Sequence, residues 1–208
     1  FIKCREGRGV FVSYRNDRNE EADIYRGTRL LMHQPYSARL YPLDGVSFHG
    51  KVCYNREASM DRMERPDGQE LRLTEDAGNI LWIRPCVGMT YPQAGPQVRA
   101  VLHDSYHSGT IAVNAGLEEF AGRMEQAGIP VYLTGASSGE AEYETVRMYE
   151  QYGIRVLPKM SLIAAYCKLW LALSNDLDVN SIMNTCIAED IIQEQRGVIR
   201  TDEQSRRD

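Results

Sequence analysis

Residues 98–110 read Val98-Arg99-Ala100-Val101-Leu102-His103-Asp104-Ser105-Tyr106-His107-Ser108-Gly109-Thr110. The apolar run from Val98 to Leu102 predicts a buried strand. The stretch ends in Ser108-Gly109-Thr110, a small tripeptide that is rich in hydroxyls and backbone donors and favours a turn. An open parallel sheet places its ligand-binding groups in the turns that follow its strands. We therefore expect the rest of the chain to be arranged around this turn.

The sequence on both sides of this stretch alternates between strand and helix patterns. Further strands are predicted over residues 80–83, 130–134 and 154–156, and helices over 117–127, 142–152, 161–173 and 178–188. Asp178 is expected to cap the last helix at its N-terminus. Four strands separated by helices predict an α/β fold, a three-layer α/β/α arrangement around a small parallel four-stranded sheet of flavodoxin-like or Rossmann-like type.

The first third of the chain has a different pattern. Residues 9–14 and 24–31 predict two strands of a β-hairpin, which needs a partner surface because two strands alone are marginal in water. Residues 34–77 show no sustained period, apart from a small hairpin suggested at 46–54, and predict a long linker. The expected division is 1–33 as the remnant of a preceding domain, 34–77 as linker, 78–200 as the main domain and 201–208 as a frayed tail.

Composition narrows the classes of function. The 208 residues carry a net charge of −5 and are 43% hydrophobic, which gives no electrostatic case for binding nucleic acid or an anionic membrane. No apolar run reaches the length of a membrane span, and no signal peptide is recognised, so a cytoplasmic protein is expected. The five cysteines have no C-x-x-C spacing and are expected to be reduced and buried. Because the chain starts at Phe1 within strand-like sequence, it is expected to be a fragment whose earlier part is missing.

Several residues invite a chemical interpretation, each with a simpler alternative. His103 and His107 suggest a metal site, but no third ligand is close in sequence and the alternative is polar residues capping a strand end. The small loop 135–139 resembles a phosphate cradle, but the acidic residues that follow it would repel an anion. Glu144, in the first turn of a helix, either receives a ligand amine or is a solvated charge. We expect Arg147, Lys159 and Lys168 to lie on the surface. We expect Trp82 and Trp170 to lie in the core.

The order of these segments resembles the carboxy-terminal domain of the bacterial-type L-asparaginase/glutaminase family, with its interdomain linker. Residues 9–14 look like the last strand of that family's amino-terminal domain, and Arg26-Gly27-Thr28-Arg29 is similar to the hairpin after it. Residues 80–89 are similar to a strand ending in Pro-Gly-Met, and residues 100–109 to the next strand and its Tyr-x-Ser-Gly turn. The match continues through Ile129-Pro130-Val131, Tyr143-Glu144-Thr145 and the helix that contains Lys168.

This resemblance implies an enzyme that hydrolyses L-asparagine to L-aspartate and ammonia in a homodimer or homotetramer, without metal or cofactor. The family's threonine nucleophile lies in the amino-terminal domain, so no catalytic residue is expected in this chain and the fragment alone would be inactive. The resemblance assigns Ser108, Gly109, Thr110, Tyr143 and Glu144 to the substrate site of a neighbouring subunit. Thr110 stands where the family commonly has asparagine, and a hydroxyl cannot replace both groups of an amide.

Two other classes of function stay open. One is a non-catalytic module that senses an amino acid or mediates assembly, because some members of the family bind asparagine allosterically in this domain. The other is a flavodoxin-like nucleotide binder, which the acidic residues Glu140, Glu142 and Glu144 after the 135–139 loop argue against.

Overall fold

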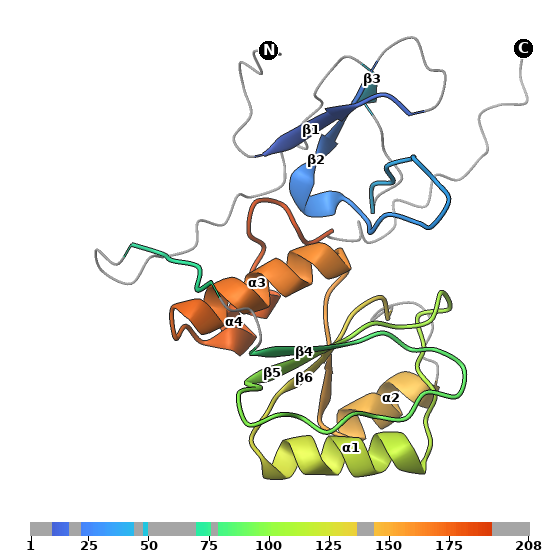
Figure 1. The fold of residues 1–208 in the computed structure, drawn as a ribbon, viewed down its shortest axis with the longest axis vertical. Helices are drawn as coiled ribbons and strands as arrows, with labels where there is room; N and C mark the ends of the chain where they lie inside the picture. The colour runs from blue at the N-terminus through green and yellow to red at the C-terminus, as the bar shows by residue number, and fades with distance from the viewer. Residues whose placement is uncertain are drawn as a thin grey trace, which may run out of the picture.

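The computed structural model describes residues 10–16, 22–43, 48–49, 70–75, 79–136 and 144–192. Two sheets organise this part of the chain (Figure 1). An antiparallel sheet near the N-terminus holds β1 to β3 and continues into a short 3₁₀ helix, η1; we call these elements the antiparallel unit. A parallel sheet of β4 to β7 with helices α1 to α4 forms the parallel unit.

The parallel sheet has the strand order β4-β5-β6-β7. Its strands are β4 (Ile80–Ile83), β5 (Ala100–His103), β6 (Val131–Leu133) and β7 (Ile154–Val156), and each pairs in parallel with the next. All four residues of β5 are buried because helices cover both faces of the sheet. The strand begins two residues later than predicted, since the amide of Val98 still donates to the carbonyl of Gly95 in a turn.

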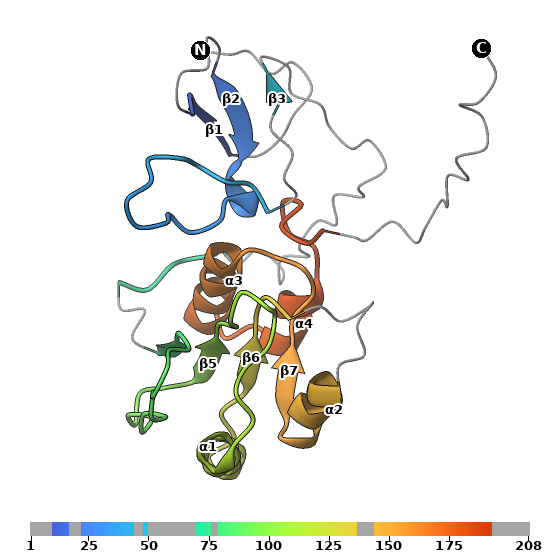
Figure 2. The ribbon, with the colours of Figure 1, turned by 90° about the vertical axis from the view of Figure 1, so that its right-hand side faces the viewer.

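Four helices complete the three layers. On one face lie α1 (Ala115–Gln126) and α2 (Glu144–Gln151), where Leu117, Phe120 and Tyr149 pack against Val101 and Leu133. On the other face lie α3 (Leu162–Ser174) and α4 (Val179–Asn184), which pack against alternate residues of the same strands. The predicted three-layer α/β/α fold with a small parallel sheet is therefore confirmed (Figure 2).

Side-chain caps mark where the helices start. Asn114 accepts a hydrogen bond from the Leu117 amide at the start of α1, and Ser161 accepts one from the Ala164 amide at the start of α3. Asp178 accepts one from the Asn180 amide, so the predicted cap of α4 is confirmed. The predicted extension of α4 to residue 188 is wrong: the helix stops at Asn184 because Thr185 is extended (φ −88°, ψ 132°).

The antiparallel unit contains the predicted hairpin, made of β1 (Phe11–Tyr14) and β2 (Asp23–Arg26). The second strand was predicted to run to residue 31, but it ends at Arg26, where η1 (Gly27–Arg29) turns the chain. A short third strand, β3 (Phe48–His49), pairs antiparallel with β2, so β2 is central in this sheet. Most of the suggested 46–54 hairpin lies outside the described residues.

Several predictions about burial are wrong, and two of them have the same cause. Helix α3 is apolar on almost every side, so its sequence does not show which side faces the sheet. Lys168 lies on the buried side and Cys167 on the exposed side. Trp82, on the edge strand β4, is 40% exposed beside the ring of Tyr166. Cys86 is exposed as well, in the loop after β4.

Other side chains lie where expected or close to it. Arg147 and Lys159 are exposed, and Trp170 is half-buried, with its indole nitrogen donating to the carbonyl of Thr74. In the described ranges, no helix is both long and apolar enough to cross a membrane.

Candidate functional site

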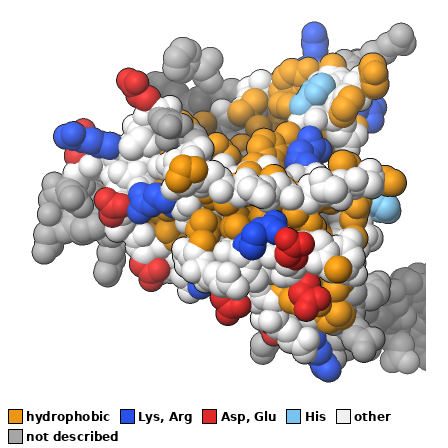
Figure 3. All heavy atoms as spheres, turned by 60° about the horizontal axis from the view of Figure 1, so that its bottom comes forward, with side chains coloured by type: hydrophobic (Ala, Val, Ile, Leu, Met, Phe, Trp, Pro, Cys, Tyr) orange, Lys and Arg blue, Asp and Glu red, His pale blue; other side chains and the backbone are white. Residues whose placement is uncertain are grey.

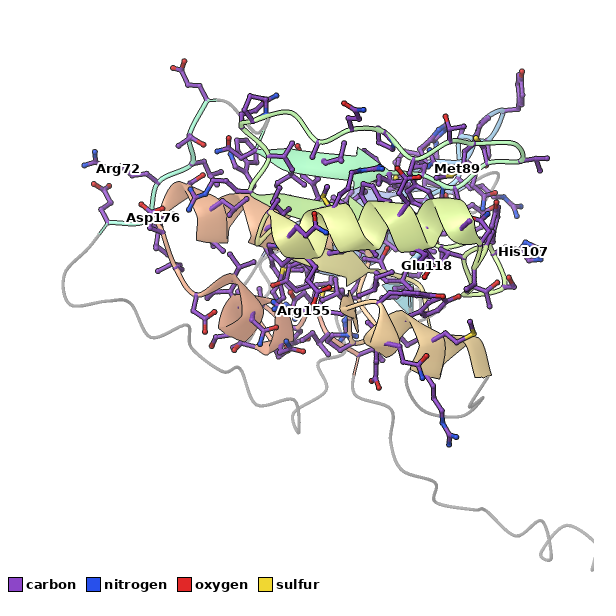
Figure 4. The ribbon with its side chains drawn as sticks, turned by 90° about the horizontal axis from the view of Figure 1, so that it is seen from below. Arg72, Met89, His107, Glu118, Arg155 and Asp176 are labelled. Atoms are coloured by element: carbon purple, nitrogen blue, oxygen red, sulfur yellow. The ribbon has the colours of Figure 1, made fainter. Side chains whose placement is uncertain are left out.

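The loops that follow the strands of the parallel sheet meet at one end of the parallel unit. Figure 4 shows Met89, from the loop after β4, and His107, from the loop after β5, at this end, opposite Arg72 and Asp176. This is the edge where parallel α/β sheets carry their ligands, because the carboxyl ends of the strands open there. The turn at residues 106–110 lies in this region.

Backbone hydrogen bonds hold the turn closed. The Gly109 amide donates to the Tyr106 carbonyl at 2.8 Å, and the Tyr106 amide donates to the Thr110 carbonyl at 2.9 Å. Gly109 has φ +74°, a conformation that glycine adopts without steric cost. The hydroxyl oxygens of Ser108 and Thr110 lie 2.8 Å apart on the outer side of the turn. One hydroxyl donates to the other, which leaves one hydroxyl hydrogen for a ligand.

The turn also contacts the end of the neighbouring strand, β6. A Cβ atom placed on Gly109 would lie 2.8 Å from the carbonyl oxygen of Gly135. Gly135 itself has φ +77°, and a Cβ atom there would overlap the hydroxyl of Ser105. Glycine is therefore favoured at both positions, and most strongly at Gly109, where the close atom belongs to the backbone.

A buried tyrosine forms hydrogen bonds with the backbone directly after the turn. The Tyr149 hydroxyl, on α2, accepts a hydrogen bond from the Ile111 amide at 2.8 Å and donates to the Ile111 carbonyl at 3.2 Å. Because Tyr149 and Ile111 are both buried, each polar group satisfies the other and neither is left unpaired in the core. Helix α2 thereby fixes where the chain leaves the turn.

His103, the last residue of β5, is fully buried and takes part in a second network. Its Nδ1 lies 2.5 Å from the Asp104 carbonyl oxygen, which can only accept, so Nδ1 carries the proton. Its Nε2 then accepts from the Tyr91 hydroxyl at 3.1 Å. Burial raises the pKa of Tyr91 to about 12, which keeps this hydroxyl protonated. Tyr91 in turn stacks on Phe120 of α1, with ring centroids 4.8 Å apart.

The buried imidazole predicts a dependence of stability on pH. Burial lowers the pKa of His103 below its ordinary value of 6.5, although contact with the Asp104 carbonyl opposes this. Above pH 6.5 the ring is neutral in both states and stability is complete. As the pH falls below 6.5, the unfolded state binds the proton first, so the free energy of unfolding falls by up to about 1.4 kcal/mol per pH unit until the folded pKa is reached.

Urea unfolding at pH 7.5, 6.5 and 5.5 measures this effect. His103→Gln should show a shallower loss of stability than the wild type between pH 6.5 and 5.5, and His107→Gln, at an exposed loop position, should follow the wild type. Equal slopes for His103→Gln and the wild type would contradict the assignment of a neutral, buried His103.

The structure describes three of the five predicted site residues. Ser108 is exposed, and Gly109 and Thr110 are half-buried in the same turn. Glu144 is the first residue of α2, but its side chain lies outside the described part, as does all of Tyr143. Whether these two residues join the turn therefore stays a prediction.

Residues to which the sequence interpretation gave no role in the site lie in the turn or beside it. The guanidinium of Arg84, after β4, lies 3.8 Å from a carboxylate oxygen of Asp104, after β5. Asp104 also accepts from the Ser105 amide, and the Tyr106 hydroxyl donates to the Cys86 carbonyl at 3.4 Å. Arg84 and Asp104 could have been noticed in the sequence, because each closely follows a predicted strand and these two strands are neighbours in the sheet.

The metal interpretation of His103 and His107 does not survive the geometry. Both ring nitrogens of His103 are engaged inside the core, whereas His107 lies on the exposed part of the loop. Across the described residues, His, Cys, Asp and Glu side chains form no group of three that could hold a metal ion. Of the 135–139 loop only Gly135 and Ala136 are described.

The surface charges are mixed. On the face shown in Figure 3, Lys and Arg side chains alternate with Asp and Glu and do not gather into one basic patch. This agrees with the net charge of −5.

The fold and the turn together define a three-layer α/β protein that carries a hydroxyl-bearing turn at the carboxyl end of its parallel sheet. Two solved structures share this fold. L-asparaginase I from Vibrio cholerae O1 biovar eltor aligns with a TM-score of 0.58 and 17% identity, over 82% of this chain and 55% of that one. The thermostable L-asparaginase from Thermococcus kodakarensis aligns with a TM-score of 0.57 and 20% identity, over 89% of this chain and 58% of that one.

At these identities the likeness shows a shared fold, and it confirms at that level the resemblance to an asparaginase carboxy-terminal domain. The chain spans a little more than half the length of either asparaginase. No protein-family model matches the sequence, and no curated protein matches it.

Proposed function

We propose that this chain is the carboxy-terminal part of an L-asparaginase-like amidohydrolase, which converts L-asparagine and water to L-aspartate and ammonia. The observation that carries the proposal is the combination of an asparaginase fold with an exposed pair of hydroxyls at the carboxyl end of β5. The nucleophile belongs to an amino-terminal domain that precedes these residues in the full-length protein. The chain alone is inactive because it lacks that domain.

In this proposal the turn completes the substrate site of a neighbouring subunit in a homodimer or homotetramer. Ser108, Gly109 and Thr110 contact the substrate there, together with Tyr143 and Glu144. The turn suits such a role because its backbone is fixed by two hydrogen bonds and by contact with Gly135, while its hydroxyls face outward. A fixed donor costs little entropy when a ligand binds.

The proposal includes a domain division and a location. Residues 1–33 end the amino-terminal domain, 34–77 are the linker, 78–200 are the carboxy-terminal domain and 201–208 are the tail. The change from an antiparallel to a parallel sheet between β3 and β4 supports the second of these boundaries, between residues 77 and 78. The protein acts in the cytoplasm, without metal or cofactor, and binds neither nucleic acid nor membrane.

Substitutions in the turn of the full-length protein test the role of the two hydroxyls. Thr110→Asn should lower the KM for asparagine by about fivefold, because a side-chain amide carries its donor and its acceptor on separate atoms and one further hydrogen bond is worth about 1 kcal/mol. Ser108→Ala should raise the KM by a similar factor, and kcat should change less than the KM in both variants. Ammonia release measured against asparagine concentration gives both constants.

Ser181→Asn, on the exposed side of α4, is the control and should leave both constants unchanged. Unchanged kinetics in both turn variants would place the turn outside the substrate site. Asparagine binding measured by calorimetry, in a full-length protein that releases no ammonia, would favour the amino-acid sensor over the enzyme.

A further inference from the structure

Charged side chains join the antiparallel unit to the parallel unit through the segment after α4. Figures 1 and 2 both place α3 and α4 between the parallel sheet and the antiparallel strands. Residues 185–190 leave α4 on this side. We call them the latch segment.

Glu189 of the latch segment makes ion pairs with residues of the antiparallel unit. Its carboxylate lies 2.9 Å from Nε of Arg26, at the end of β2, and 3.9 Å from a terminal guanidinium nitrogen of Arg29, in η1. The Glu189 side chain is only 7% exposed and that of Arg26 only 9%. A carboxylate buried to this degree requires its cationic partners, because without them its desolvation is uncompensated.

Backbone carbonyls of the latch segment also accept hydrogen bonds from the antiparallel unit. The Arg29 guanidinium also donates to the Glu189 carbonyl at 2.9 Å, and the Thr28 hydroxyl donates to the Ala188 carbonyl at 2.9 Å. The hydroxyl of Ser161, which caps α3, donates to the Thr28 carbonyl at 3.3 Å. Thus η1 is held by both the latch segment and the start of α3.

A second buried pair fixes the latch segment to the parallel unit. Lys168 of α3 lies 2.9 Å from a carboxylate oxygen of Asp190, and both side chains are almost completely buried. Lys168 also donates to the Thr185 carbonyl at 2.6 Å, and Asp190 accepts from the Ile187 amide at 2.8 Å. These contacts leave the backbone of the segment little freedom.

The segment keeps an unfavourable backbone conformation. Ala188 has φ +51° and Glu189 has φ +58°, and left-handed values in consecutive residues other than glycine are costly. Such a conformation persists only where the surrounding contacts hold it. At Glu189 those contacts are the guanidinium groups of Arg26 and Arg29.

We propose that the latch segment is a conformational latch, closed by Glu189 on Arg26 and Arg29, which controls whether the antiparallel unit stays folded against the parallel unit. The antiparallel sheet has only three short strands within the described residues, so its stability depends on the surface against which it packs, and opening the latch unfolds the antiparallel unit locally while the parallel unit stays intact. This proposal does not depend on the enzymatic function.

Hydrogen exchange of the full-length protein tests the latch. Glu189→Gln should speed exchange of the amides at residues 24–27 on the order of 100-fold, because it removes one partner of a buried ion pair. Exchange of the amides at residues 101, 102 and 132, in the parallel sheet, should change less than about twofold. Glu119→Gln removes an exposed ion pair with Arg123 on α1 and should change neither region.

Two further variants separate charge from backbone strain. Glu189→Gly relieves the positive φ but removes the carboxylate, so it should speed exchange at residues 24–27 as Glu189→Gln does. Thr28→Ala removes one neutral hydrogen bond at the same joint and should speed exchange there about fivefold, so it tests the latch even if the Glu189 variants fold poorly. Unchanged exchange at residues 24–27, or equal acceleration in both units, would overturn the proposal.

Discussion

Lys168→Met is expected to lower the free energy of unfolding by about 3–5 kcal/mol, because it leaves Asp190 as a buried carboxylate without a counter-charge. The side chains of Lys168 and Asp190 are 6% and 2% exposed and their charged atoms lie 2.9 Å apart. Methionine fills a similar volume to the lysine stem, so the loss reports the charge and not a cavity. The carbonyls of Met183 and Thr185 lose a donor as well.

Urea unfolding measures this loss as a lower midpoint at an unchanged slope. Lys159→Met, at an exposed position, is the matched control and should change stability by less than about 0.5 kcal/mol. The double variant Lys168→Met/Asp190→Asn should be more stable than Lys168→Met, because asparagine still accepts from the Ile187 amide but carries no charge. A loss below about 1 kcal/mol for Lys168→Met would show the pair to behave like an exposed one.

The second large effect is expected at Gly109, in the turn. Gly109→Ala should cost about 2–4 kcal/mol, because alanine is strained at φ +74° and its Cβ would lie 2.8 Å from the Gly135 carbonyl oxygen. That oxygen belongs to the backbone and cannot move aside as the end of a flexible side chain can. The turn must therefore open or the end of β6 must shift.

Gly128→Ala separates the cost of backbone strain from the cost of the clash with the Gly135 carbonyl oxygen. Gly128 has φ +66°, but no heavy atom lies within 4 Å of its added Cβ, so only the backbone strain of about 1–2 kcal/mol applies. Unfolding in urea compares the two variants directly. Equal losses for Gly109→Ala and Gly128→Ala would mean that the turn is not in tight contact with Gly135 and yields without cost.

The parallel unit could be predicted from the sequence because its local signals agree with its fold. Short apolar runs bounded by turn residues predicted all four strands, and Gly128 and Gly153 mark where the helices before β6 and β7 end. Asp178 was recognised as a cap because a capping side chain acts on the next residues in sequence. In these places local chemistry decided the structure.

Contacts between residues far apart in sequence could not be predicted in this way. The sequence predicts that Lys168 is a surface lysine, because its ion-pair partner Asp190 lies 22 residues away, in the latch segment. Glu189 contacts Arg26, from the other unit, and no local pattern marks either residue. Exposure of Cys167 and Trp82 also depends on which side of α3 and β4 the rest of the fold covers.

In the candidate site, too, the local part could be predicted from the sequence and the long-range contacts could not. The position of the turn after β5 follows from the chain order, and Ser108, Gly109 and Thr110 were predicted as a group because they are adjacent. The support beneath them could not be predicted: Tyr149 reaches Ile111 from α2, and Tyr91 reaches His103 from the loop after β4. These hydrogen bonds depend on the packing of side chains across the sheet.

Ammonia release from L-asparagine by the full-length protein is the most direct measurement of the central claim. We predict that the full-length protein releases ammonia and aspartate in equal amounts, and that residues 1–208 expressed alone release neither. Chromatography of the amino acid product, in parallel with the ammonia assay, verifies the ratio. The absence of ammonia release from asparagine and from glutamine, by a full-length protein that is folded and oligomeric, would contradict the assignment of this chain to an asparaginase-like amidohydrolase.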